Sequence, residues 1–118
     1  MGFQVCDHEH IHELQRETRR IAVEHGWENE ERSFGDLIAL CHSELSEALE
    51  EYRKFGLDPA YFHYYESDKP EGIGIELADV IIRVFHMAEV LDIDMEKMIR
   101  DKLDYNKTRE FRHGGKVL

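Results

Sequence analysis

Cysteine and proline are scarce in this chain, and each shortage excludes a class of structure. Its 118 residues include two cysteines and two prolines. Cys6 and Cys41 lack the close spacing of a zinc site or a disulfide framework, so we interpret both as free thiols. With only two prolines and few runs of β-branched residues, an all-β fold has little support. The length is that of one domain, residues 1–118, with room for a single core.

An excess of positive charge and long apolar runs are also missing. The chain has 15 lysines and arginines against 26 aspartates and glutamates, a formal net charge of -11. Nucleic-acid backbones and anionic membranes would be repelled, so neither is expected as a partner. No apolar stretch approaches the roughly 20 residues of a membrane-spanning helix, and residues 1–10 lack the regions of a signal peptide. We therefore expect a cytoplasmic protein.

Helical periodicity is what the sequence contains in abundance. Apolar residues recur every three to four positions in four segments, which predicts an all-α fold, a four-helix bundle. Gly26 and Gly56 are expected to end the first two helices, and Ser33 with Asp36 resembles a capping box. The third segment is apolar on most sides and should be the most buried. The predicted helices run from about Asp7 to His25, Ser33 to Lys54, Ile73 to Leu91, and Asp94 to Tyr105 or slightly beyond.

The connection between the second and third helices, residues 57–74, is the least regular part of the chain. It holds both prolines, and we expect one short helical turn after Asp58. A connection of this length in a small domain is often functional. Its aromatic residues suit a subunit contact or a substrate pocket equally well; they are Tyr61, Phe62, Tyr64 and Tyr65.

Two pairs of carboxylates stand out because of their position on the predicted helices. Glu44 and Glu47 lie three residues apart on the second helix, and Glu76 and Asp79 lie three apart on the third, so each pair shares a helix face. Such pairs also occur on ordinary solvated faces in an acidic chain. The second pair, however, lies on an otherwise apolar helix, where Arg83 is expected to neutralise Asp79. Two facing pairs would form an all-oxygen site suited to Mg²⁺ or Mn²⁺.

At this point the sequence resembles a known superfamily. An ExxE pair followed on a later helix by an ExxD pair is similar to the signature of the MazG-like all-α nucleoside triphosphate pyrophosphohydrolases. The Gly-Trp sequence at residues 26–27 and a K-x-x-x-N-x-x-R pattern near the end are similar as well. The resemblance covers roughly residues 27–116. That last pattern is formed by Lys102, Asn106 and Arg109.

The resemblance implies a reaction, the hydrolysis of a ribo- or deoxynucleoside triphosphate between its α- and β-phosphates, which gives the monophosphate and pyrophosphate. It implies that the four acids hold Mg²⁺, with Mn²⁺ as a substitute, and Glu47 is our candidate to orient or deprotonate the attacking water. It also implies an oligomer, a homodimer or a homotetramer. By the same resemblance Trp27 would stack on the base, and the phosphates would contact Lys102, Asn106 and Arg109.

Two other functions stay open from the sequence. A di-iron carboxylate bundle needs Glu-x-x-His pairs on facing helices, and Glu9 with His12 and Glu110 with His113 have that spacing. The second is a non-catalytic helical protein that keeps this fold and binds a nucleotide or another protein. Residues 57–74 match no motif that would indicate a base or sugar preference.

Overall fold

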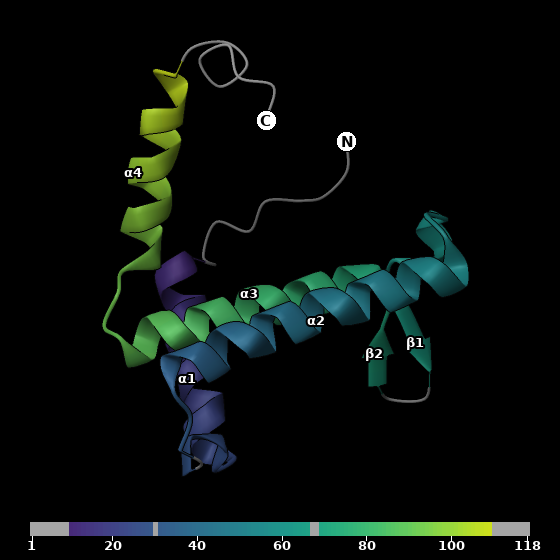
Figure 1. Ribbon diagram of the computed structural model, residues 1–118, viewed down its shortest axis with the longest axis horizontal. Helices are drawn as coiled ribbons and strands as arrows, with labels where there is room; N and C mark the ends of the chain where they lie inside the picture. The colour runs from purple at the N-terminus through teal and green to yellow at the C-terminus, as the bar shows by residue number, and fades with distance from the viewer. Residues whose placement is uncertain (1–9, 30, 67–68, 110–118) are drawn as a thin grey trace.

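The computed structural model describes residues 10–29, 31–66 and 69–109, which form four helices and a short hairpin (Figure 1). The all-α class with four main helices is therefore confirmed. None of the described helices is both long enough and apolar enough to cross a membrane. The helices are α1 (Ile11–Glu24), α2 (Phe34–Phe55), α3 (Ile73–Val90) and α4 (Met95–Lys107). The smaller elements are the 3₁₀ turns η1 (Trp27–Asn29) and η2 (Pro59–Tyr61) and the strands β1 (Tyr64–Glu66) and β2 (Lys69–Glu71).

The helix ends follow the capping residues that the sequence predicts. The backbone N–H of Asp36 donates to Oγ of Ser33 over 3.1 Å, and the Asp36 carboxylate accepts from the Ser33 N–H over 2.9 Å, which completes the capping box of α2. Asp94 caps α4 by accepting from the N–H of Lys97 over 3.0 Å. Gly26 and Gly56 follow α1 and α2 with φ of 70° and 64°, values that favour glycine. The predicted start of the first helix at Asp7 lies outside the described residues.

The connection after α2 holds one predicted element and one that the sequence did not indicate. Asp58 caps the expected turn η2 by accepting from the N–H of Ala60 over 3.0 Å. The antiparallel β1–β2 hairpin follows, with Tyr64 opposite Glu71. Gly72 then leads into α3 with φ of 119°, and a Cβ on it would lie 2.6 Å from the carbonyl oxygen of Tyr61. The hairpin thus returns to η2 so closely that only glycine fits where α3 begins.

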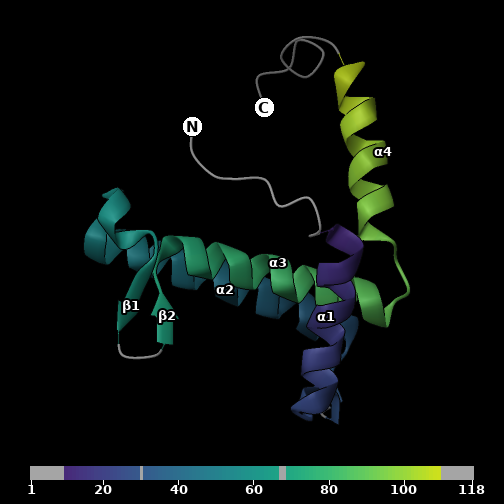
Figure 2. The same cartoon turned by 180° about the vertical axis from the view of Figure 1, so that it is seen from behind.

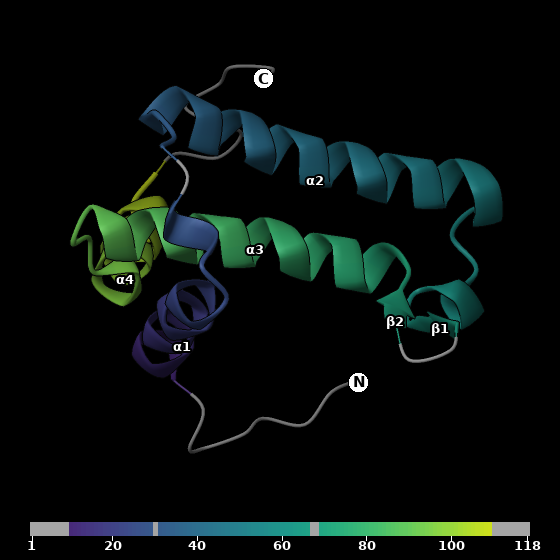
Figure 3. The ribbon, with the colours of Figure 1, turned by 90° about the horizontal axis from the view of Figure 1, so that it is seen from below.

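The helices are not all packed against one another within one chain. Helices α2 and α3 run antiparallel and side by side, and α1 crosses α3 (Figures 1 and 3). Helix α4 extends away from this group, as the reverse view also shows (Figure 2). The radius of gyration is 16.9 Å, against about 13 Å for a compact domain of about 100 residues. A closed four-helix bundle therefore stays a prediction.

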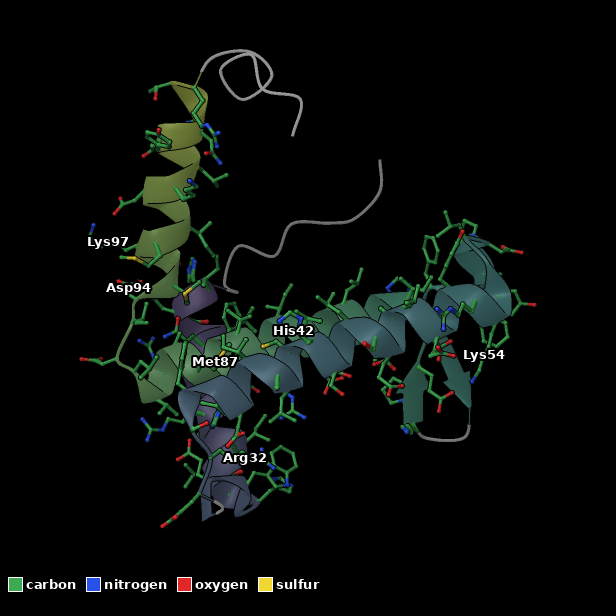
Figure 4. The ribbon with its side chains drawn as sticks, viewed as in Figure 1. Arg32, His42, Lys54, Met87, Asp94 and Lys97 are labelled. Carbon is green, nitrogen blue, oxygen red and sulfur yellow. The ribbon has the colours of Figure 1, made fainter. Side chains whose placement is uncertain are left out.

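The core lies where α1 crosses α3 and is small. Among the described residues, four apolar side chains are buried, Ala22 from α1 and Phe85, Met87 and Ala88 from α3. Figure 4 shows Met87 at this crossing. Helix α3 is therefore the most buried helix, as its composition predicts. Its apolar surface is nevertheless only partly covered, since Ile81 remains 53% exposed.

A buried polar residue, Gln15, joins α1 to the turn before α4. Its Nε2 donates to the carbonyl oxygen of Ile93 over 2.8 Å, and its Oε1 accepts from the N–H of Met95 over 3.2 Å. Only 6% of the residue is exposed. Both backbone groups lie at the start of α4, so Gln15 helps to set the direction in which α4 leaves the core.

Replacing Gln15 with methionine is expected to lower the free energy of unfolding by about 1–3 kcal/mol, because two backbone groups lose their partner in a poorly hydrated place. Urea unfolding followed by circular dichroism measures the change. Arg16→Met, on an exposed neighbour, is the matched control and should change stability little. Equal stability of both variants would contradict the structural role of Gln15.

Candidate metal site and adjoining cavity

The structure brings together three of the four predicted metal ligands. Glu44 of α2 and Glu76 and Asp79 of α3 each place a carboxylate oxygen within 4.8 Å of the other two. We call these three residues the acid triad. All three are half-buried. They meet because α2 and α3 pack along their lengths, with one polar position of α2 and two of α3 at the contact.

Electrostatics at Glu76 and Asp79 favour their uncharged forms or a bound cation. Burial, followed by the charges of Asp79, Glu44, Glu47 and Glu51, raises the pKa of Glu76. Burial, followed by the charge of Glu44, also raises the pKa of Asp79, while Arg83 and a hydrogen bond with Glu76 act in the opposite direction. Gathered carboxylates repel one another, and a cation placed among them removes that repulsion.

Glu47, the fourth predicted ligand, lies at the edge of the acid triad and is exposed. Its negative charge nonetheless acts to raise the pKa of Glu76. The negative charge of Glu51, one turn further along α2, acts in the same direction. Glu51 is half-buried on the same side of the helix. The second carboxylate of the ExxE pair thus faces the solvent side of the site, where a water molecule can approach it.

Arg83 binds the acid triad in a way that the sequence did not predict. Its Nε and Nη2 donate to the same oxygen, Oε1 of Glu44, over 3.2 and 3.1 Å. The sequence predicted that Arg83 would neutralise Asp79, one turn earlier on the same helix, and the charge of Arg83 does act to lower the pKa of Asp79. The hydrogen bonds, however, go to Glu44 of the facing helix. The Arg83 side chain remains 38% exposed.

A cavity of about 450 Å³ adjoins the acid triad and is bounded by α1, η1, α2 and α3. Its size is within the range of small-molecule sites. Its lining includes the apolar side chains of Ala22, Trp27, Leu37 and Ile82 and the charged or polar side chains of Glu44, Asp79, Arg83 and His86. Arg32, labelled in Figure 4 just before α2, also lines it. Apolar and charged side chains therefore line one space.

Trp27 lies in this cavity rather than in the core. It is 59% exposed, and its ring stacks on His25 with centroids 4.9 Å apart. The turn that carries it is fixed by the next residue, because Oε1 of Glu28 lies 2.8 Å from Nε2 of His86 and 3.2 Å from Nε of Arg19. Trp27 is therefore not a core residue in this chain, and its exposed surface is accessible to a flat ligand or another subunit.

The three predicted phosphate contacts lie elsewhere. Lys102 and Asn106 are on α4 and Arg109 follows it, and all three are exposed. Lys102 places its ammonium 5.1 Å from the ring centroid of Tyr105, its neighbour on the same helix. Since α4 extends away from α2 and α3 (Figure 1), one chain does not bring these residues to the acid triad. Their role stays a prediction.

The residues of the di-iron alternative are mostly outside the described part of the chain. Glu9, Glu110 and His113 are not described, and His12 faces the acids at the start of α4. Its Nε2 lies 2.8 Å from Oδ1 of Asp94, and its Nδ1 lies 3.4 Å from Oε2 of Glu96. His12 thus has a local structural role in joining α1 to α4.

Comparisons with known proteins add no family assignment. No protein-family model, no curated protein and no solved structure matches this chain. The site must therefore be interpreted from its own residues.

The raised pKa values of Glu76 and Asp79 predict how stability depends on pH without metal. A raised pKa means that the folded state binds more protons than the unfolded state, so the free energy of unfolding falls as pH rises from about 4.3 through the raised value. Glu76→Gln removes one of these charges. In EDTA its Tm is expected to exceed that of the wild type at pH 7, by a margin that shrinks as the pH falls toward 4.

Thermal scans from pH 4 to 8 measure this difference. Glu50→Gln is the control, because Glu50 is an exposed glutamate of α2 that pairs with Arg53 at 2.8 Å. Saturating Mg²⁺ should raise the Tm of the wild type more than that of Glu76→Gln. A lower Tm for Glu76→Gln at pH 7 in EDTA would show that the carboxylates do not repel one another.

Proposed function

We propose that this protein is a Mg²⁺-dependent nucleoside triphosphate pyrophosphohydrolase of the MazG-like type, which cleaves between the α- and β-phosphates to give monophosphate and pyrophosphate. The observation that carries the proposal is the junction of the acid triad with the cavity that contains Trp27. A nucleotide has the same two parts, a flat base and a chain of anionic phosphates. The cavity lining offers aromatic and apolar side chains to the base, and the acid triad offers carboxylates to a cation that would hold the phosphates.

The donor set fits the proposed metal. Mg²⁺ prefers oxygen ligands and is often held by one or two carboxylates together with substrate phosphates. The acid triad supplies carboxylate oxygens from Glu44, Glu76 and Asp79, already gathered and half-buried. A bound Mg²⁺ would neutralise phosphate charge and lower the pKa of a water molecule. Mn²⁺ suits the same ligands.

The chain's own residues supply the remaining functions of the proposed site. Trp27 stacks on the base, because its exposed ring lines the cavity. Glu47 accepts a hydrogen bond from the attacking water and removes its proton, since it is exposed at the edge of the triad. Ile82 and Leu37 add apolar surface to the lining of the cavity.

The proposed enzyme is an oligomer, in which a second copy of the chain covers apolar surface of the first. Helix α2 carries an apolar stripe that nothing covers along the described chain, with Leu45 48% and Leu49 46% exposed. The four buried apolar side chains are few for a domain of this length. We therefore place the stripe in the contact of a homodimer or homotetramer. The phosphate contacts of Lys102, Asn106 and Arg109 depend on this assembly, because α4 extends away from the triad within one copy.

The test is pyrophosphate release from a panel of ribo- and deoxynucleoside triphosphates, with Mg²⁺ and with EDTA. The proposal predicts release that needs Mg²⁺ and is lost in Glu47→Gln but kept in Glu50→Gln, an exposed control on the same helix. Release of orthophosphate would mean that a different bond is cut. Binding of nucleotide with Mg²⁺ but without turnover would favour the alternative, a non-catalytic nucleotide- or protein-binding protein with this fold.

A further inference from the structure

Arg83 is shared between the acid triad and the cavity. Its guanidinium donates two hydrogen bonds to Oε1 of Glu44, and the same side chain lines the cavity that contains Trp27. It also lowers the pKa of Asp79 through its charge, so it lies close to a second member of the triad. The positive charge of Arg83 thus partly neutralises the acid triad.

A divalent cation and this guanidinium compete for one carboxylate. The oxygen of Glu44 that faces Arg83 already accepts two charge-assisted hydrogen bonds, which neutralise much of its charge. A metal ion among Glu44, Glu76 and Asp79 would repel the neighbouring guanidinium and weaken its bond to Glu44. At 38% exposure, with the cavity beside it, the Arg83 side chain has room to move.

A phosphate bound by the triad's metal would lie next to Arg83. Glu44 and Asp79 line the same cavity as Arg83, so a phosphate held there by a cation of the triad would be within reach of the guanidinium. Arginine presents paired donors that match phosphate oxygens, and the group would need only a side-chain rotation from Glu44. Within one chain α3 therefore offers a cation at the triad, whereas the cations of α4 are remote (Figure 1).

We propose that Arg83 exchanges partners during the reaction cycle: it binds Glu44 when the metal is absent, and it binds the phosphate chain of the nucleotide when the metal is present. This inference rests on the proposed function and assigns a substrate-binding residue to it. Arg83 therefore weakens metal binding to the free protein and strengthens nucleotide binding to the metal-loaded protein. Opposite effects on two ligands distinguish this role from one that merely holds Glu44 in place.

The experiment measures both affinities in the full chain. Mn²⁺ binding without nucleotide is followed by the electron paramagnetic resonance of the free ion. Binding of the α,β-imido analogues of the four deoxynucleoside triphosphates at saturating Mn²⁺ is followed by calorimetry. For Arg83→Gln we expect Mn²⁺ to bind several-fold more tightly, and the analogue that binds the wild type best to bind at least tenfold more weakly.

Two control variants separate the proposed role of Arg83 from effects on folding and from the loss of a positive charge. Arg53→Gln removes an exposed arginine of α2 that pairs with Glu50, and it should change neither affinity. Arg83→Lys keeps the charge without the paired donors, so its nucleotide affinity should lie between wild type and Arg83→Gln. It also serves as the test variant if Arg83→Gln does not fold.

Three outcomes would overturn the inference. Weaker Mn²⁺ binding in Arg83→Gln would mean that Arg83 only positions Glu44 as a ligand. Unchanged affinities in Arg83→Gln, with a wild type that releases pyrophosphate, would reject the role of Arg83 and leave the proposed function standing. A wild type that binds neither Mn²⁺ nor any analogue would reject the proposed function and this inference together.

Discussion

Replacing Asp79 with asparagine is expected to lower the rate of Mg²⁺-dependent pyrophosphate release by about 10³-fold or more. Asp79, like Glu44, belongs to the acid triad and also lines the cavity, so it is at the junction of the proposed metal site and the proposed nucleotide site. An amide is a weaker ligand for Mg²⁺ and adds no negative charge. Loss of the metal's contribution removes several kcal/mol of transition-state stabilisation, and each 1.36 kcal/mol is a tenfold change in rate.

Initial rates with the preferred triphosphate, over a range of Mg²⁺ concentrations, measure the effect. Asp79→Asn should unfold at a temperature no lower than the wild type in EDTA, because the substitution removes a charge whose pKa is raised by burial. Lost activity therefore cannot be attributed to lost structure. Glu50→Gln should retain full activity. A rate within tenfold of the wild type for Asp79→Asn would remove the acid triad from the mechanism.

The double substitution Leu45→Lys with Leu49→Lys is expected to dissociate the proposed oligomer. Both leucines are about half exposed in the single chain and belong to the uncovered stripe of α2. Complete burial of a leucine contributes about 1.5–3 kcal/mol, so two lost contacts per chain should raise the dissociation constant by at least about 100-fold. Two lysines in an apolar contact add a cost of desolvation.

Sedimentation equilibrium over a range of protein concentrations measures the assembly. The wild type should have the mass of a dimer or tetramer, and the double variant that of one chain. Glu50→Lys places one lysine on the same helix outside the stripe and should leave the mass unchanged. A monomeric wild type, or a double variant of unchanged mass, would mean that the stripe is not an interface.

Local signals explain most of what the sequence predicts about the fold. Ser33 with Asp36, Asp94 and Gly56 each act on backbone groups within a few residues, so their effects do not depend on the rest of the chain. The hairpin escaped prediction because its strands are three residues long, too short for an alternating pattern to be distinct. The tight contact of Gly72 with Tyr61 is visible only after η2 and α3 have come together.

Contacts between distant segments explain what the sequence did not predict about the site. The i, i+4 rule favours Asp79 as the partner of Arg83, yet Glu44, 39 residues away, takes the hydrogen bonds. No sequence pattern assigned a role to Gln15, whose side chain donates to the carbonyl oxygen of Ile93 at a separation of 78 residues. By contrast, the regular spacing of the acids was sufficient to place Glu44, Glu76 and Asp79 on faces that could meet.

Helix α3 belongs to both the core and the candidate site. Its C-terminal half supplies the buried Phe85, Met87 and Ala88 to the core, and its N-terminal half supplies Glu76 and Asp79 to the acid triad. Packed interiors transmit displacement rather than absorb it. A change in the size of Phe85 would therefore rotate or shift α3 as a rigid rod and change the separation of its carboxylates from Glu44. We therefore expect the affinity of the acid triad for a cation to depend on core residues further along the helix, which do not belong to the triad.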